Sequence, residues 1–209
     1  RDERIRQAYT SVAGAYADQL LDELDKKPFD RWLLERLAAL SDGGPVADVG
    51  CGPGQVAAHL ALSGADVTGF DLSDGMVAEA RRRFPELRFE VADLRALPSP
   101  DDGGDWAVIT AWYALVHFAA SELPAAIAAL ARAIRPGGWV AVALHEGSEV
   151  RRVEDWVEAG ASVEFTFNRR DDVVAAFRAA GLTEVEWYLR SASSPAEAPT
   201  DRLYVLGRH

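Results

Sequence analysis

The residues best suited to bind a ligand in this sequence are three glycines at every second position, with acidic residues around them. Gly50, Gly52 and Gly54 follow the apolar run 46–49, which contains Asp48. Glycine lets the backbone pass close to a ligand, and a helix that starts after such a loop offers unpaired N–H groups. The spacing predicts a ligand-binding loop, although a tight turn without a ligand would use the same residues.

Two further aspartates end the next two apolar runs. Asp71 lies 21 residues after Gly50, close to the spacing at which an acidic residue meets ribose hydroxyls in nucleoside-binding sheets. Asp93 ends the following run, where a carboxylate or the adjoining amides could read an adenine edge. Asp71 on its own could simply cap the following turn, but the series of positions favours adenosine.

The glycine pattern differs from two common phosphate-binding loops. A dinucleotide loop would have glycine where Gln55 stands, and the lysine of a P-loop is missing. The chain has 22 basic and 33 acidic residues, a formal net charge of −11. This environment suits a cationic or zwitterionic nucleoside without phosphate, which is the character of S-adenosylmethionine.

The elements that would position these residues alternate along the chain. Short apolar runs predict strands and amphipathic stretches predict helices between them, which implies a parallel, doubly wound α/β sheet with ligands beyond the carboxyl ends of its strands. Two final strands without a helix between them should pair as an antiparallel hairpin. The expected strands are 46–49, 66–70, 87–91, 106–111, 139–144, 183–189 and 202–206, and the expected helices are 55–62, 74–83, 122–134 and 171–180.

The remaining segments complete a single expected domain over residues 1–209. We divide it into a helical cap (1–41, two helices broken at Pro28), a cofactor-binding core (42–147), an irregular insert or lid (148–170) and a carboxyl-terminal helix and hairpin (171–209).

These motifs together resemble those of the class I S-adenosylmethionine-dependent methyltransferases that act on small molecules. Segment 46–54 is similar to motif I of that family, 69–76 to motif II, 91–94 to the adenine motif and 132–140 to the turn before the fifth strand. The resemblance implies a seven-stranded, mostly parallel sheet in the order 3-2-1-4-5-7-6, with strand seven antiparallel and a helical cover at the amino-terminal end.

The resemblance also implies the cofactor and its contacts. S-adenosylmethionine would bind and leave as S-adenosylhomocysteine, with Asp48 and Gly50 facing the methionine moiety, Asp71 accepting both ribose hydroxyls and Asp93 bonding the adenine amino group. For Met76 and Leu94, core packing is an equally good interpretation. The full set of implied cofactor residues is Tyr16, Asp48, Gly50, Gly52, Gly54, Asp71, Leu72, Met76, Asp93, Leu94 and Ala111.

Histidines near the ends of the fourth and fifth strands could supply a base, which is required only if the acceptor must lose a proton. His117 is the first candidate, since a neutral imidazole can take a proton near pH 7, but it could equally pack in its loop. His145 with Glu146 is a weaker pair, because adjacent strand residues point to opposite faces. We expect Cys51 to be a packing residue.

The amino-acid composition argues against several classes of binding partner. The negative charge argues against nucleic acid and anionic membranes, and a single cysteine excludes a disulfide framework and a cysteine-rich zinc site. We expect a cytoplasmic protein, because no apolar run approaches a membrane span and no leader is visible. Aromatic residues in 148–169, with Tyr9 and Tyr16, indicate a flat or apolar small acceptor, although packing of the added segments would give the same composition.

The favoured function is methyl transfer to an O, N or C nucleophile of a small molecule. The alternative is an S-adenosylmethionine-binding protein that does not transfer the methyl group, and either serves as a ligand-holding partner or catalyses a rearrangement with the cofactor as a spectator. A nicotinamide-dependent reductase is disfavoured by the shifted glycine and the closing hairpin. The sequence leaves the acceptor and the oligomeric state open.

Overall fold

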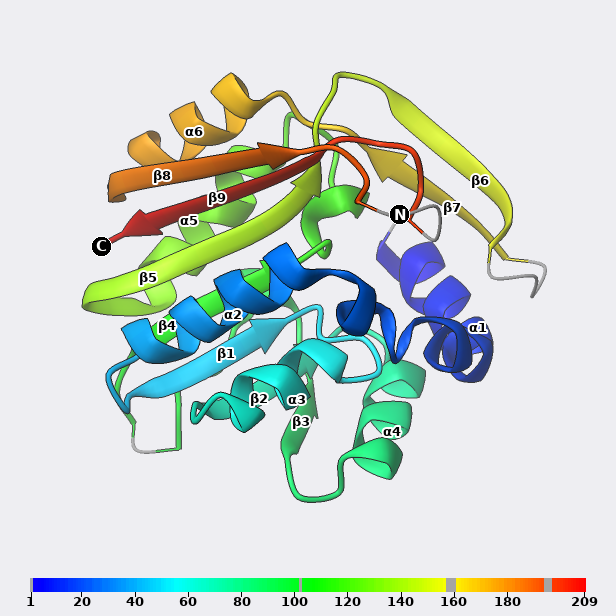
Figure 1. The fold of residues 1–209 in the computed structure, drawn as a ribbon, viewed down its shortest axis with the longest axis horizontal. Coiled ribbons are helices and arrows are strands. Elements are labelled where there is room, and N and C mark those ends of the chain that lie inside the picture. Colours follow the sequence, from blue (N-terminus) through cyan, green and yellow to red (C-terminus); the bar gives the residue numbers. More distant parts are fainter. Residues whose placement is uncertain (1, 102, 157–160, 194–196) are drawn as a thin grey trace.

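A seven-stranded sheet forms the centre of the molecule in a computed structural model that describes residues 2–101, 103–156, 161–193 and 197–209 (Figure 1). The strand order is β3-β2-β1-β4-β5-β9-β8, with β9 antiparallel to both neighbours and the other pairs parallel. This confirms the expected order and the closing hairpin. The strands are β1 (Pro45–Val49), β2 (Asp66–Asp71), β3 (Arg88–Val91), β4 (Trp106–Trp112), β5 (Ile134–His145), β8 (Thr183–Arg190) and β9 (Arg202–Arg208).

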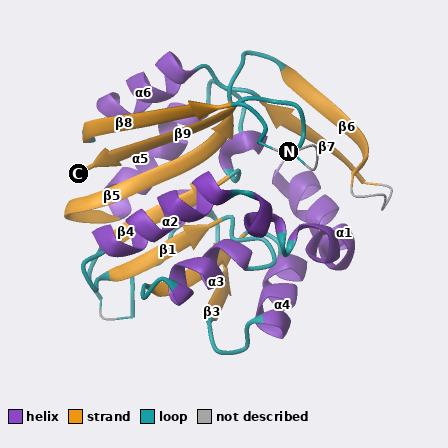
Figure 2. Ribbon diagram, in the orientation of Figure 1, coloured by secondary structure: helices purple, strands orange, loops and turns teal. Residues whose placement is uncertain are grey.

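Helices cover both faces of this sheet (Figure 2). On one face, α2 (Pro28–Leu40), α3 (Gln55–Leu62) and α4 (Asp74–Arg83) share an apolar core with the strands. On the other, α5 (Leu123–Ala133) and α6 (Arg170–Ala179) pack in a second core. The central strand β4 is buried along its whole length, as expected for a strand covered on both faces.

The carboxyl ends of the parallel strands are covered by the amino-terminal segment. Helix α1 (Asp2–Leu20) packs against α4, and the short helix η1 (Glu23–Lys26) joins it to α2. Two other short helices, η2 (Leu94–Ala96) and η3 (Leu115–His117), follow β3 and β4. No helix among the described residues is long and apolar enough to cross a membrane.

The insert between β5 and α6 is more regular than the sequence indicated. Strands β6 (Val150–Trp156) and β7 (Ala161–Thr166) form a separate antiparallel hairpin, which stands beside α1 in Figure 1. Its strands were missed because charged residues break the alternation in β6. Strand β7 contacts α1 and η3, which are distant in sequence, so local periodicity does not reveal what positions this hairpin.

Candidate functional site

A crevice opens where β1, β2, β3 and β4 end, beneath α1. Nine of the twelve residues predicted to form the site line it, and they come from the glycine loop, from the segments after β2 and β3, from α1 and from η3. These nine are Tyr16, Gly50, Gly52, Asp71, Leu72, Met76, Asp93, Leu94 and His117.

Three predicted cofactor residues lie outside this lining. Gly54 directly precedes α3 and has a φ of 93°. A Cβ there would stand 2.9 Å from Phe89 of β3, so this glycine lets the start of α3 pack against β3. Ala111 is buried in the core beside α5. Asp48 is fully buried in β1, below the loop.

Asp71 ties the glycine loop to the end of β2. One carboxylate oxygen accepts a hydrogen bond from Gly52 N–H at 2.9 Å and the other from Ser73 N–H at 2.8 Å. Burial raises the pKa of Asp71, and these N–H groups oppose that shift. The turn-capping interpretation is therefore correct in part, but each oxygen keeps a further acceptor position for a ligand hydroxyl.

Gly50 shows why this loop needs glycine. Its φ is 71°, and an added Cβ would stand 2.3 Å from the Cβ of Ala114. The close approach brings the backbone after β1 against the backbone after β4, and both segments line the crevice.

Buried acceptor atoms without partners lie around the loop. Asp48 Oδ1 accepts a hydrogen bond from Thr110 at 3.0 Å, while Asp48 Oδ2 and Gln55 Oε1 are buried and have no partner among the described residues. Burial raises the pKa of Asp48 to about 7, with the Thr110 hydrogen bond opposing that shift. Unpaired acceptors in an acidic surrounding favour a ligand that donates or carries positive charge.

Gln55 also contacts one member of a pair of charged residues, Glu23 and Lys27, that the sequence analysis did not predict to be part of the site. Its Nε2 donates to Glu23 at 3.0 Å, and Lys27 pairs with Glu23 at 2.6 Å. The Lys27 ammonium lies 5.4 Å from the centre of the Tyr113 ring, which lines the crevice. No local sequence pattern marks Glu23 and Lys27 as site residues, because η1 reaches the loop only through the tertiary fold.

Asp93 lies at the other end of the crevice, already engaged by an arginine. Arg95 pairs with Asp93 at 2.5 Å and with Asp2 of α1 at 2.6 Å. The hydrogen bonds from Arg95 lower the pKa of Asp93 despite some burial. Met76 is almost completely buried, so its packing role is present together with its place in the lining.

His117 is held from both sides. Its Nδ1 lies 2.9 Å from the backbone oxygen of Glu164, and its Nε2 lies 2.7 Å from the Tyr9 hydroxyl. Because a carbonyl oxygen only accepts, Nδ1 carries the proton and Nε2 accepts from Tyr9. Burial raises the pKa of the Tyr9 hydroxyl, which keeps it a donor. The imidazole thus joins η3 to α1 and β7.

The other candidate side chains have structural roles. Burial lowers the pKa of His145 to about 4, and its ring stacks on Phe167 with centroids 5.2 Å apart. Glu146 instead accepts a hydrogen bond from Arg170 N–H at 2.8 Å at the start of α6, so the two do not form a dyad. Cys51 is a buried free thiol that donates to the backbone oxygen of Gly52 at 3.6 Å, and burial raises the pKa of this thiol.

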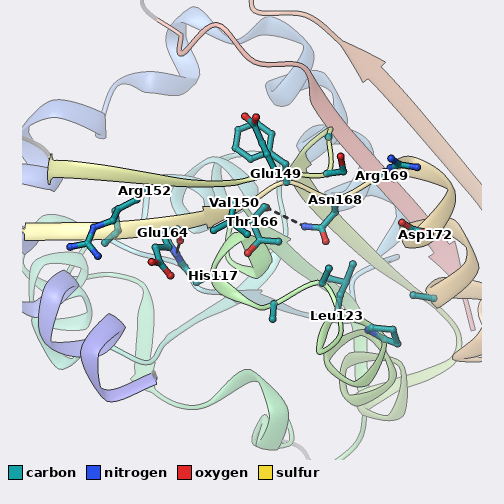
Figure 3. A pocket seen from close by; sticks show the side chains of 18 of the residues that line it. His117, Leu123, Glu149, Val150, Arg152, Glu164, Thr166, Asn168, Arg169 and Asp172 are labelled. Carbon is teal, nitrogen blue, oxygen red and sulfur yellow. Dashed lines mark hydrogen bonds between the residues drawn. The ribbon is translucent and has the colours of Figure 1, made fainter.

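A larger cavity of about 860 Å³ adjoins the crevice. Figure 3 shows it between the β6–β7 hairpin and the helices α5 and α6. Ile5 and His117 line both spaces. His117 therefore stands where a group bound in the crevice would meet a molecule bound in the larger cavity.

Residues 46–138 match the family model described as a methyltransferase domain. Over this segment the chain is therefore similar to methyltransferase domains. The matched segment contains the glycine loop, Asp71, Asp93 and His117. The amino-terminal cap and the β6–β7 hairpin lie outside it.

Individual proteins similar in sequence to this chain are also methyltransferases. A demethylmenaquinone methyltransferase from Beutenbergia cavernae is 36% identical over 140 residues, which cover 63% of this chain and 57% of the relative. A trans-aconitate 2-methyltransferase from Methylobacterium nodulans is 40% identical over 106 residues, covering 50% of this chain and 39% of the relative. The chain thus spans about half the length of these relatives.

Solved structures extend the likeness of the fold beyond the matched segment. Magnesium protoporphyrin IX methyltransferase from Synechocystis PCC 6803, with bound S-adenosylhomocysteine, superposes with a TM-score of 0.75 at 17% identity. The superposition covers 100% of this chain and 99% of that protein. The cap and the carboxyl-terminal hairpin therefore belong to the shared fold.

Proposed function

We propose that this protein transfers the methyl group of S-adenosylmethionine to an O, N or C nucleophile of a small molecule. The observation that carries the proposal is the convergence of the glycine loop, Asp71 and Asp93 on one crevice, with His117 between that crevice and a second cavity. The cap and hairpin cover the site closely, which favours a small acceptor over a folded macromolecule.

The crevice residues fit each part of the cofactor. Asp71 has acceptor positions for the two ribose hydroxyls, and the apolar side chains of Leu72, Met76 and Leu94 line the space for the adenine ring. Asp93 or the adjoining backbone would read the adenine edge once Arg95 yields one of its bonds.

The methionine end has matching groups beside the loop. The unpaired oxygens of Asp48 and Gln55, with the carboxylate of Glu23, suit an ammonium group, and the Lys27 ammonium suits a carboxylate. When bound, S-adenosylmethionine supplies a methyl group on a positively charged sulfur. A nucleophile attacks the methyl carbon on the side opposite the sulfur, and the sulfur is the leaving group. The protein contributes mainly by holding the nucleophile in line and excluding water.

His117 would take the proton of an acceptor that must be deprotonated. With Nδ1–H held by the Glu164 carbonyl, Nε2 is the nitrogen available as base. The Tyr9 hydroxyl that donates to Nε2 would either release it or pass the acceptor proton on. Glu164 then stabilises the resulting imidazolium through the same carbonyl.

Thermal unfolding with S-adenosylhomocysteine tests the cofactor site. A concentration 100-fold above Kd stabilises a protein by about 2.7 kcal/mol, which corresponds to a rise in Tm of roughly 5–10 °C for a chain of this size. Asp71→Ala should lose most of this rise, whereas Asp66→Ala, at the exposed opposite end of β2, should keep it. No rise for the wild-type protein would contradict the proposal.

Transfer itself is tested with methyl-labelled S-adenosylmethionine and a panel of small phenols, amines and hydroxy acids. Formation of S-adenosylhomocysteine together with labelled acceptor supports methyl transfer. Tight cofactor binding without transfer to any acceptor would favour the alternative function, in which the cofactor is held without reaction.

A further inference from the structure

The cavity under the β6–β7 hairpin has an apolar side made by two helices and the hairpin. Its volume of about 860 Å³ lies within the range of roughly 300–1,000 Å³ typical of small-molecule sites. Leu123 of α5, Ala175 and Ala176 of α6 and Val163 of β7 contribute this side, and Figure 3 places Leu123 opposite the hairpin. These side chains suit the apolar body of a small molecule.

Two buried polar side chains interrupt the apolar lining. Thr166 is 7% exposed and Asn168 is 4% exposed, and both line the cavity. Asn168 Nδ2 donates to the backbone oxygen of Thr166 at 3.2 Å, the dashed line in Figure 3. This bond fixes the orientation of the amide. Asn168 Oδ1 and the Thr166 hydroxyl make no hydrogen bond within the described residues and are not among the fully enclosed polar atoms that lack a partner, so both keep some accessible surface beside the cavity.

Small-molecule sites combine an apolar lining with a few polar groups that orient the ligand, and Thr166 and Asn168 are placed to serve as such groups. The hydroxyl of Thr166 can donate or accept, and Asn168 offers a free carbonyl oxygen and one N–H. A ligand group that both donates and accepts satisfies this pair. Hydroxyl and carboxamide groups have that property.

The positive and negative side chains that line the cavity are equal in number. Arg4 and Arg169 have no acidic partner among the described residues, and Glu164 and Asp172 have no basic one. The remaining lining charges are paired locally, Glu149 with Arg151 and Arg152 with Glu154. The two free cations and two free anions give the cavity no net preference for a charged ligand.

The polar pair lies a short distance from His117 along one strand. Glu164, whose carbonyl holds the imidazole, precedes Thr166 by two residues, which is about 7 Å in a strand. A single ring with a substituent at each end can bridge this distance. Its reacting atom would then lie at His117 and its other substituent at the polar pair.

We propose that the acceptor is an uncharged, ring-sized molecule whose hydroxyl or carboxamide group, opposite the methylated atom, is recognised by Thr166 and Asn168. The inference rests on the proposed methyl transfer, because it places the reacting atom at His117. It assigns the selection of the acceptor to two residues outside the segment that matches the family model.

Three probes of similar size and different charge test this selection. Binding of 4-hydroxybenzamide, 4-hydroxybenzoate and 4-hydroxybenzylamine is measured by calorimetry with S-adenosylhomocysteine present. We expect the neutral amide to bind at least tenfold more tightly than either charged probe. A charged probe that binds as tightly as the amide, or no binding of the amide at millimolar concentration, would overturn the proposal.

Two variants and one control locate the effect. Thr166→Val should weaken amide binding about three- to tenfold, the effect of one uncharged hydrogen bond. Asn168→Asp should weaken amide binding and turn the preference between charged probes toward the amine. Thr183→Val, at the exposed start of β8 and outside the cavity lining, should bind all three like the wild-type protein. Unchanged probe affinities in both variants would refute the assignment.

The thermal shift with S-adenosylhomocysteine is recorded on the same samples. If it is present but the amide does not bind, only the acceptor inference fails. If it is absent, the proposed methyl transfer fails, and amide binding measured without the cofactor product still decides whether the cavity selects a neutral ligand. A retained shift in each variant also shows that the variant is folded.

Discussion

Burial in the folded protein strongly disfavours the ionised form of the Asp48 carboxyl group. It is fully buried, and its Oδ2 has no partner among the described residues. Its pKa rises from an ordinary 3.8 to about 7, so protonated Asp48 favours the folded state. This stabilisation is fully present below pH 3.8 and is lost as the pH rises through about 7.

We predict that Asp48→Asn stabilises the cofactor-free protein at pH 8.5 and has little effect at pH 5. A pKa rise of this size corresponds to at most about 4 kcal/mol, and the asparagine can still accept the Thr110 hydrogen bond. Urea unfolding at both pH values measures the difference. Asp66→Asn serves as the exposed control, and an Asp48→Asn variant that is no more stable at pH 8.5 would contradict the expectation.

His117 provides a second prediction for a single residue. His117→Ala should leave the affinity for S-adenosylhomocysteine within about threefold, since the cofactor residues remain, and should lower kcat by roughly 10²–10⁴ for an acceptor that must lose a proton. Kinetics with labelled S-adenosylmethionine and the best acceptor measure this. A variant with full kcat would show that His117 only connects the cap to the hairpin.

Between elements, a buried ionic cluster joins α2 to the carboxyl-terminal hairpin. Asp30 accepts hydrogen bonds from Trp112, Tyr204 and Arg190, and Arg190 also pairs with Glu197 at 2.8 Å. Burial alone would raise the pKa of Glu197, but hydrogen bonds from Arg190 and Ser193 N–H hold it at about 2. The stability this contributes is present above the ordinary value of 4.5 and is lost as the pH falls through about 2.

We predict that Arg190→Met destabilises the protein by about 3–5 kcal/mol, because two buried carboxylates lose their cation. The expected fall in Tm is roughly 6–20 °C. Thermal and denaturant unfolding at pH 7 measure it. Arg82→Met, which removes an exposed pair with Glu79, should change stability by less than about 1 kcal/mol, and an equally small effect at Arg190 would show the cluster to be unimportant.

At the scale of elements, the sequence predicted those parts whose signals are local. Short apolar runs such as 46–49, bounded by glycine and proline, marked the strands of the main sheet. Charged residues in β6 interrupt the alternating pattern, so the β6–β7 hairpin was not predicted. Asp71 and Gly50 could be placed because they follow strands directly, but Glu23, Lys27 and the carbonyl of Glu164 reach the site only through packing between distant segments.

For the whole molecule, the hairpin is separable from the sheet. It forms its own two-stranded sheet, and Val150 and Thr166, which bound it, are paired neighbours. A short linker can therefore replace the residues between them without straining the main sheet.

We predict that replacing residues 151–165 by Gly-Ser-Gly leaves the fold and the Tm rise with S-adenosylhomocysteine intact but abolishes 4-hydroxybenzamide binding. Circular dichroism, thermal unfolding and calorimetry measure these properties. Complete unfolding would show that the hairpin is required for the core, and retained amide binding would place the acceptor elsewhere.

The arrangement of the hairpin also affects how the protein can change over evolutionary time. Strands β6 and β7 do not pair with any of the seven main strands, so insertions, deletions and substitutions within this hairpin can leave the hydrogen-bond register of those strands unchanged. Lineages can therefore exchange this segment, and with it their choice of acceptor, while the cofactor half stays under constant selection. We expect homologous chains to diverge in length and composition first within residues 148–169.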